Sequence, residues 1–145
     1  MKTIRHFCVV ISDLKRSLRF YRDLLGLKVD KEFNESGVYI DNILGLKNAI
    51  YHNVKMSAEN GSTQIELAKV ETHESEANTT ENILKIGASH ICFETEDLDA
   101  LYKRLVKDGV DFICQPQLVP QGVAKVTFCK DPDGTLIELV EILKK

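Results

Sequence analysis

Two histidines and two glutamates recur at matched points in the two halves of the chain. His6-Phe7-Cys8 recurs 84 residues later as His90-Ile91-Cys92, and Thr63-Gln64-Ile65-Glu66-Leu67 recurs 72 residues later as Thr135-Leu136-Ile137-Glu138-Leu139. A solvent-facing strand does not require the same residue types twice, so the repeat favours a shared binding site. Two imidazoles and two carboxylates that meet at one point form a four-ligand site for a divalent metal ion.

Each glutamate of the repeat lies between apolar neighbours on a predicted strand. One such glutamate alone would be expected to face solvent, because an unpaired buried carboxylate is very costly. The duplication reverses that expectation, since it pairs each glutamate with a histidine of the same half. The sequence therefore predicts four metal ligands: His6, Glu66, His90 and Glu138.

The mixed nitrogen and oxygen donor set restricts the metal. Imidazole and carboxylate suit Zn, Ni, Co, Mn or Fe as a divalent ion, whereas Ca and Mg prefer oxygen throughout. A six-coordinate ion would keep two positions for water or substrate, and open positions distinguish catalytic from structural sites. One catalytic divalent metal per site is the expectation.

Other side chains have weaker claims to a chemical role. Cys8 and Cys92 follow each histidine by two residues on the same strand face, so they either line the pocket or, as we favour, are small core residues. His52 and His73 have no repeat partner and are expected at the surface. Gln64 shares a face with Glu66 and is expected to touch substrate or solvent.

A strand followed by a helix positions the first histidine. Residues 4–11 are rich in β-branched side chains, Asp13 stands where a helix N-cap belongs, and Gly26 ends the helical spacing. The cations of that helix, expected to form a solvated face, are Lys15, Arg16, Arg19 and Arg22. Shorter strands are predicted over residues 27–29, 38–40, 49–55 and 64–70.

The same order restarts in the second half. Residues 89–93 predict a strand, Asp97 a cap, and Gly109 a helix end, and strands follow over 112–114, 124–129 and 136–142. The first half carries about a dozen extra residues, which we place between Asn34 and Asn53. Each half is thus a β-α-β-β-β module, about 1–70 and 88–145, joined by a polar linker, 71–87, in a single domain of α+β class.

Composition excludes several classes of protein. At 145 residues and a net charge of −3, the chain gives no electrostatic reason to expect nucleic acid or an anionic membrane as a partner. No apolar run approaches the roughly 20 residues of a membrane helix, and the N-terminus lacks a signal-peptide pattern, so a cytoplasmic location is expected. The cysteines show no Cys-x-x-Cys spacing and are expected to be small buried residues: Cys8, Cys92, Cys114 and Cys129.

These motifs resemble the vicinal oxygen chelate superfamily, which includes glyoxalase I, methylmalonyl-CoA epimerase, extradiol dioxygenases and bleomycin or fosfomycin resistance proteins. The resemblance spans nearly the whole chain. It rests on the His6 strand, the Leu14 to Gly26 helix, Gly87-Ala88-Ser89-His90-Ile91-Cys92-Phe93, and Phe128-Cys129-Lys130-Asp131-Pro132-Asp133-Gly134 leading into Ile137-Glu138-Leu139. It implies a glyoxalase-like fold, in which the two modules form a cupped, mixed sheet.

Glyoxalase I is the most similar pattern within that superfamily. Its metal is held by His or Gln, Glu, His and Glu at the positions of His6, Glu66, His90 and Glu138. The resemblance implies a lactoylglutathione-lyase-like lyase or isomerase that acts on a small oxygen-chelating substrate through an enediolate. By family analogy Glu138 takes and returns the proton, with Glu66 as its opposite partner, and the protein is a homodimer.

Three alternatives remain open. An epimerase resembling methylmalonyl-CoA epimerase would commonly have Gln at the position of Glu66. An extradiol-type dioxygenase would use the two-His, one-Glu set of His6, His90 and Glu138 with Fe or Mn. A non-catalytic, drug-resistance-like protein would only bind a small molecule. The insertion around Ile43-Leu44-Gly45-Leu46 departs from the glyoxalase I pattern and is expected to cap the pocket.

Overall fold

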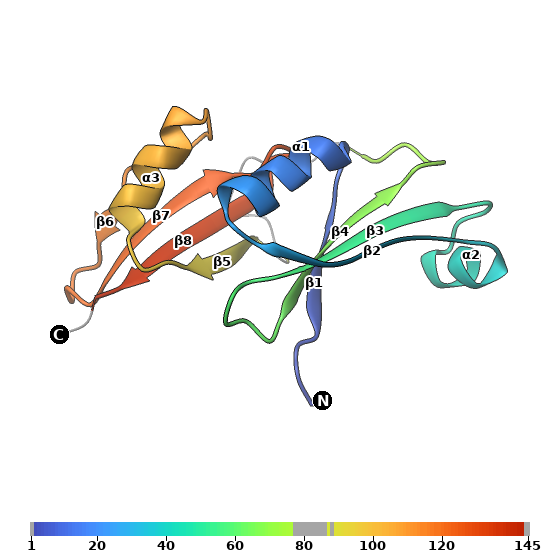
Figure 1. Ribbon diagram of the computed structural model, residues 1–145, viewed down its shortest axis with the longest axis horizontal. Helices are drawn as coiled ribbons and strands as arrows, with labels where there is room; N and C mark the ends of the chain where they lie inside the picture. Colours follow the sequence, from blue (N-terminus) through green and yellow to red (C-terminus); the bar gives the residue numbers. More distant parts are fainter. Residues whose placement is uncertain (1, 77–86, 88, 144–145) are drawn as a thin grey trace. The chain divides into compact units, whose positions relative to one another are not determined.

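The computed structural model describes residues 2–76, 87 and 89–143, which belong to two compact units, Met1–Ala77 and Asn78–Lys145. Each unit contains its own four-stranded mixed sheet and at least one helix (Figure 1). The predicted α+β fold of two modules is confirmed. Most of the predicted polar linker, residues 77–86, lies outside the described residues.

Unit 1 contains four strands and three helical segments: β1 (His6–Val10), α1 (Leu14–Leu18), η1 (Arg19–Leu24), β2 (Lys28–Ser36), α2 (Val38–Leu44), β3 (Ile50–Ser57) and β4 (Gln64–Val70). The strand order is β1-β4-β3-β2, with β1 parallel to β4 and the other pairs antiparallel. β1 and β4, which carry the first histidine and glutamate, are therefore neighbours.

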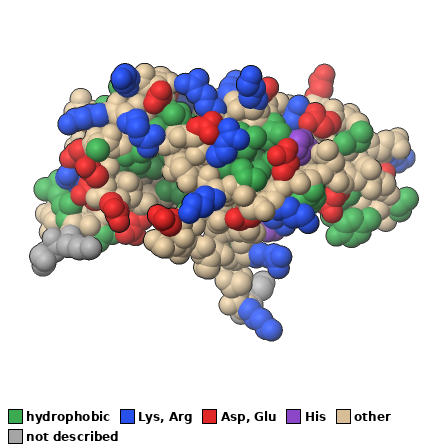
Figure 2. All heavy atoms as spheres, in the orientation of Figure 1, with side chains coloured by type: hydrophobic (Ala, Val, Ile, Leu, Met, Phe, Trp, Pro, Cys, Tyr) green, Lys and Arg blue, Asp and Glu red, His purple; other side chains and the backbone are tan. Residues whose placement is uncertain are grey.

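The predicted start of the first helix is confirmed. The Asp13 carboxylate accepts a hydrogen bond from Arg16 N at 2.7 Å and so satisfies an amide that would otherwise have no partner in the helix. The helix continues as the π-helical turn η1, and Gly26 follows with φ of 81°, a left-handed conformation that favours glycine. The four cations of this segment are exposed, and Figure 2 shows Lys and Arg side chains gathered over α1.

Alternation along the strands divides the sheet of unit 1 into two faces. Ile65 and Leu67 of β4 are buried with Val54 and Met56 of β3, and they form the core beneath α1 and η1. The intervening residues point to the other face, which carries Glu66. We call this the site face of unit 1.

The described residues of unit 2 repeat the plan with one helix. In chain order they form β5 (His90–Glu94), α3 (Leu98–Lys107), β6 (Gln117–Leu118), β7 (Ala124–Lys130) and β8 (Leu136–Ile142), with the strand order β5-β8-β7-β6. Asp97 caps α3 by accepting from Ala100 N at 2.9 Å, as predicted. The predicted turn between β7 and β8 is present, with Gly134 N donating to Asp131 O.

The internal repeat of the sequence corresponds to the same pairing of strands in the two units. Cys8 lies opposite Glu66 in the parallel pair β1·β4, and Cys92 lies opposite Glu138 in the parallel pair β5·β8. The extra segment of the first half is α2 with its flanking turns, which lies between β2 and β3.

The strand predicted over residues 38–40 is wrong, because these residues begin α2. A run of three apolar residues is compatible with the two-residue period of a strand and with the 3.6-residue period of a helix. Ile40 and Leu44, four residues apart, lie on one face of the helix, and Ile40 is buried. The Asp41 carboxylate accepts from the backbone amides of Asn48 and Ala49, which closes the loop after the helix. The strand predicted over 112–114 is reduced to an isolated bridge between Phe112 and Cys129.

The prediction of four buried cysteines is wrong for three of them. Cys129 is buried, whereas the other three are exposed: Cys8, Cys92 and Cys114. Over the part of the chain that the structure describes, no helix is both long and apolar enough to cross a bilayer.

Candidate metal centre

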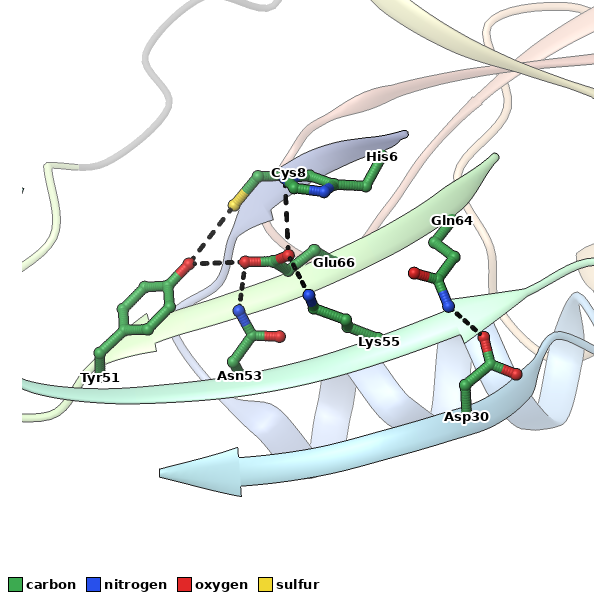
Figure 3. A network of polar contacts seen from close by, with 8 residues as sticks. All are labelled: His6, Cys8, Asp30, Tyr51, Asn53, Lys55, Gln64 and Glu66. Carbon is green, nitrogen blue, oxygen red and sulfur yellow. Dashed lines mark hydrogen bonds and ion pairs between the residues drawn. The ribbon is translucent and has the colours of Figure 1, made fainter. Parts of the chain in front are cut away.

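His6 and Glu66 come together on the site face of unit 1 (Figure 3). They reach the same face because β1 and β4 are neighbouring parallel strands and Cys8, two residues after His6, lies opposite Glu66. The distance from His6 Nε2 to Glu66 Oε2 is 3.6 Å. Glu66 is only 6% exposed, so the predicted inward orientation of this carboxylate is correct.

The buried Glu66 carboxylate is held by side chains of β3. Tyr51 Oη donates to Oε1 at 3.0 Å, and Asn53 Nδ2 donates to the same oxygen. Lys55 Nζ lies 3.7 Å from the other oxygen, Oε2. Oε1 is therefore occupied by neutral donors, while Oε2 faces His6 and Lys55.

Tyr51 stays protonated in this network. Desolvation, together with the neighbouring Cys8 and Glu66, raises the pKa of Tyr51 well above its ordinary value. Its hydroxyl therefore donates to Glu66, and the Cys8 thiol, with Sγ 3.9 Å from Tyr51 Oη, is placed to donate to the tyrosine oxygen. Cys8 thus belongs to the surroundings of the site rather than to the core.

His90 and Glu138 make the corresponding pair in unit 2. His90 Nε2 lies 3.1 Å from Glu138 Oε2, and both side chains are partly exposed. On the other side of the ring, His90 Nδ1 lies 2.8 Å from Ser89 Oγ, and Phe128 packs edge-on at a centroid distance of 5.4 Å. These contacts fix the orientation of the imidazole, so that Nε2 faces the carboxylate.

The two glutamates differ in how firmly they are held. Among the described residues, Glu138 interacts with His90 and with the Cys92 thiol, whose pKa is raised to about 11 by partial desolvation and by the Glu138 carboxylate. Directly across β7·β8 from Glu138 stands Phe128, in the position that Lys55 occupies beside Glu66. Glu66 is thus held by a tyrosine and an asparagine, whereas the described side chains that hold Glu138 are an imidazole and a thiol.

Each His and Glu pair, taken by itself, has a separation close to that of two neighbouring ligands of a divalent ion. Donor atoms about 2.1 Å from a metal and at right angles to each other lie about 3.0 Å apart. The 3.1 Å separation in unit 2 matches this value, and the 3.6 Å separation in unit 1 needs a small side-chain rotation. Within either unit, no third His, Cys, Asp or Glu of the described residues joins the pair as a metal-binding group.

Each half of the predicted ligand set is thus assembled. That all four side chains bind one ion stays a prediction. The other predicted side chains have separate partners: Gln64 Nε2 donates to Asp30 at 2.7 Å, and the half-buried His52, predicted at the surface, pairs with Glu32 at 2.9 Å. His73 Nδ1 lies 3.0 Å from Thr72 Oγ1.

The residues that hold the ligands in place were not predicted from the sequence. Tyr51, Asn53 and Lys55 alternate along a predicted strand and so share one face, which was a usable signal. The sequence did not reveal that β3 pairs with β4. Ser89 precedes His90 directly and carried no signal of its own.

The sequence model of one protein family, the Glyoxalase/Bleomycin resistance protein/Dioxygenase superfamily, matches residues 3–139 of this chain. The chain belongs to this superfamily. Its fold agrees with that of a solved superfamily member, the glyoxalase family protein from Bacillus cereus, with a TM-score of 0.88 at 22% identity over 99% of this chain and 96% of that chain.

Two other superfamily members are named for glyoxalase chemistry. A probable lactoylglutathione lyase from Synechocystis is 28% identical over 141 residues, which cover 97% of this chain and 95% of that protein. The solved trypanothione-dependent glyoxalase I of Leishmania major is 26% identical, with a TM-score of 0.66, over 97% of this chain and 87% of that chain. The resemblance to the glyoxalase superfamily expected from the sequence is confirmed.

Proposed function

We propose that this superfamily member is a divalent-metal-dependent lyase or isomerase of the lactoylglutathione-lyase kind, acting on a small oxygen-chelating substrate. The ligands of the ion would be His6, Glu66, His90 and Glu138, supplied by one chain or by two chains of a homodimer. When bound, Zn, Ni, Co, Mn or Fe would stabilise negative charge on the substrate oxygens. We further propose a cytoplasmic location.

The unequal restraint of the two glutamates carries this proposal. Glu66 accepts hydrogen bonds from Tyr51 and Asn53, so it is suited to remain a fixed, charged ligand. Among the described residues, the side-chain partners of Glu138 are the His90 imidazole and the Cys92 thiol, and Glu138 is half-buried, so it is suited to turn toward a substrate carbon. In the proposed reaction Glu138 removes a proton from the carbon beside a carbonyl group and returns it to the adjacent carbon.

The other residues would prepare this transfer. His90, oriented by Ser89, keeps its Nε2 toward Glu138 while the carboxylate moves. Phe128 keeps water away from one side of the imidazole, and the protonated Tyr51 keeps the charge of Glu66 in place. The relatives named as lactoylglutathione lyases support the reaction class.

Elemental analysis and a proton-exchange assay test the proposal together. The chain, purified without added metal, should contain one of the five metals. It should also form lactoylglutathione, or incorporate deuterium from D2O at the carbon beside the carbonyl group of a 2-hydroxycarbonyl compound. A chain that binds no metal and exchanges no proton would contradict the proposal and favour a non-catalytic binding protein. Oxygen consumption with a catechol would favour the dioxygenase alternative.

A further inference from the structure

Three charged residues stand in one row across the site face of unit 1. Glu66 of β4 lies directly opposite Lys55 of β3, and Lys55 lies directly opposite Lys31 of β2. Like charges directly opposite each other on neighbouring strands are destabilising. The two cations, which we call the lysine pair, would therefore be stabilised by a negative partner.

The carboxylates of the protein compensate the lysine pair only in part. Lys55 Nζ lies 3.7 Å from Glu66 Oε2, a long contact to an oxygen that also faces His6. Lys31 makes no ion pair with any described carboxylate. The nearby Asp30 accepts a hydrogen bond from Ser57 at 2.9 Å and another from Gln64 at 2.7 Å, the latter drawn in Figure 3, so each of its oxygens already has a donor.

Phe33 contacts both members of the lysine pair on this face. It follows Lys31 by two residues on β2 and so points the same way. Lys31 Nζ lies 4.6 Å from the centroid of the Phe33 ring, and Lys55 Nζ lies 5.7 Å from it. The ring therefore attracts both ammonium groups to the same part of the site face.

Among the described residues, the lysine pair has no counterpart in unit 2. In the register of unit 2, Phe128 stands where Lys55 stands in unit 1, directly opposite the glutamate. A cation beside the glutamate is therefore not part of the duplicated His and Glu arrangement. Its position beside only one of the two glutamates indicates a role in recognising one end of a ligand.

We propose that Lys31 and Lys55 form a binding subsite for an anionic oxygen group of the substrate, a carboxylate or a phosphate. This inference rests on the proposed function, because it places the subsite beside the Glu66 end of the metal centre. Lys55 Nζ lies 3.7 Å from Glu66 Oε2, and Lys31 stands one strand further across the sheet, where adjacent strands are about 4.8 Å apart, so the subsite begins directly beside Glu66. The substrate class is a small oxygen chelator that carries a second, distal anionic group.

A titration of the full, 15N-labelled chain with inorganic phosphate, and separately with acetate, tests the subsite. Each titration is run against chloride at constant ionic strength, so that general screening is matched. At least one of the two anions should produce saturable shifts of the β2 and β3 amides around Lys31 and Lys55. The anion that binds more tightly identifies the group as phosphate or carboxylate.

Lys31→Met should raise the dissociation constant of that anion at least about fivefold, because it removes one charge and keeps the aliphatic stem over Phe33. Lys55→Met should have a similar effect. Lys69→Met is the matched control, since Lys69 lies on the opposite face of β4 and pairs with Glu71 at 2.8 Å. It should leave the titration unchanged.

Shifts that fail to saturate with both anions, or that are the same in Lys31→Met, would overturn the subsite. The metal content of the same samples separates this failure from that of the proposed function. Bound metal without an anion response overturns the subsite alone. A response that depends on Lys31 in protein that binds no metal supports the subsite and contradicts the metal-dependent function.

Discussion

The side-chain amide of Asn53 donates to Oε1 of Glu66, and both residues are buried. A buried carboxylate without donors would be strongly disfavoured, so this bond and that of Tyr51 are what allow a charged glutamate at this position. The equivalent Glu138 has instead a thiol and an imidazole beside it. The repeat therefore supplies two glutamates with different partners, one held by two neutral donors of β3 and one beside an imidazole and a thiol.

Replacing Asn53 should destabilise unit 1 through Glu66. Asn53→Leu has a similar volume but presents an apolar group to the carboxylate, so the free energy of unfolding should fall by about 2–3 kcal/mol. Urea denaturation measures this loss. In the double variant with Glu66→Leu much of the loss should disappear, because the carboxylate is gone. A coupling energy below about 0.5 kcal/mol would contradict the account.

Removing the charge of each glutamate should have different effects. Glu138→Gln should retain metal and lower turnover by about 10²–10⁴-fold, because the group that takes the proton is lost. Glu66→Gln should instead reduce the metal content of the protein, because a neutral amide is a weaker metal ligand than the carboxylate that it replaces. Metal content and rate are measured on the same preparations. Full turnover in Glu138→Gln would refute its role as base.

Local signals in the sequence predicted more of this molecule than non-local ones could. Asp13 and Asp97 are confirmed caps because a cap depends on residues within one helical turn. The lysine pair depends on β2 lying beside β3, a non-local pairing that alternation cannot reveal. The helix that begins at Val38 was not predicted, because its short apolar run is compatible with the period of a strand as well as with that of a helix. The two His and Glu pairs were predictable because duplication marked them twice.

The cap of α3 offers a test of those local signals. Asp97→Ala should lower the free energy of unfolding by about 1 kcal/mol, because Ala100 N loses the acceptor that lies 2.9 Å away. Asp97→Asn keeps a side-chain oxygen at the cap and should be nearly neutral. Both are measured by urea denaturation. An equal loss in the two variants would show that the carboxylate acts through its charge rather than as a cap.

Alkaline pH should weaken unit 2 through Cys129. Burial, together with the Asp131 and Asp111 carboxylates, raises the pKa of this thiol from 9.0 to about 12. Between these values the unfolded chain releases the thiol proton and the folded chain keeps it, so unfolding is favoured as pH rises. The contribution of Cys129 to the free energy of unfolding is intact below about pH 9 and falls by up to about 1.4 kcal/mol per pH unit above it.

Cys129→Ala isolates this effect, because it removes the titrating thiol. The variant should be less stable at neutral pH, since it leaves a cavity in the core, but its stability should decline less steeply between about pH 9 and about pH 11. Cys114→Ala, at an exposed position, should keep the steep decline of the parent chain. Urea denaturation across this pH range gives the slopes. Parallel slopes for the parent and Cys129→Ala would mean that the buried thiol is not the group that titrates.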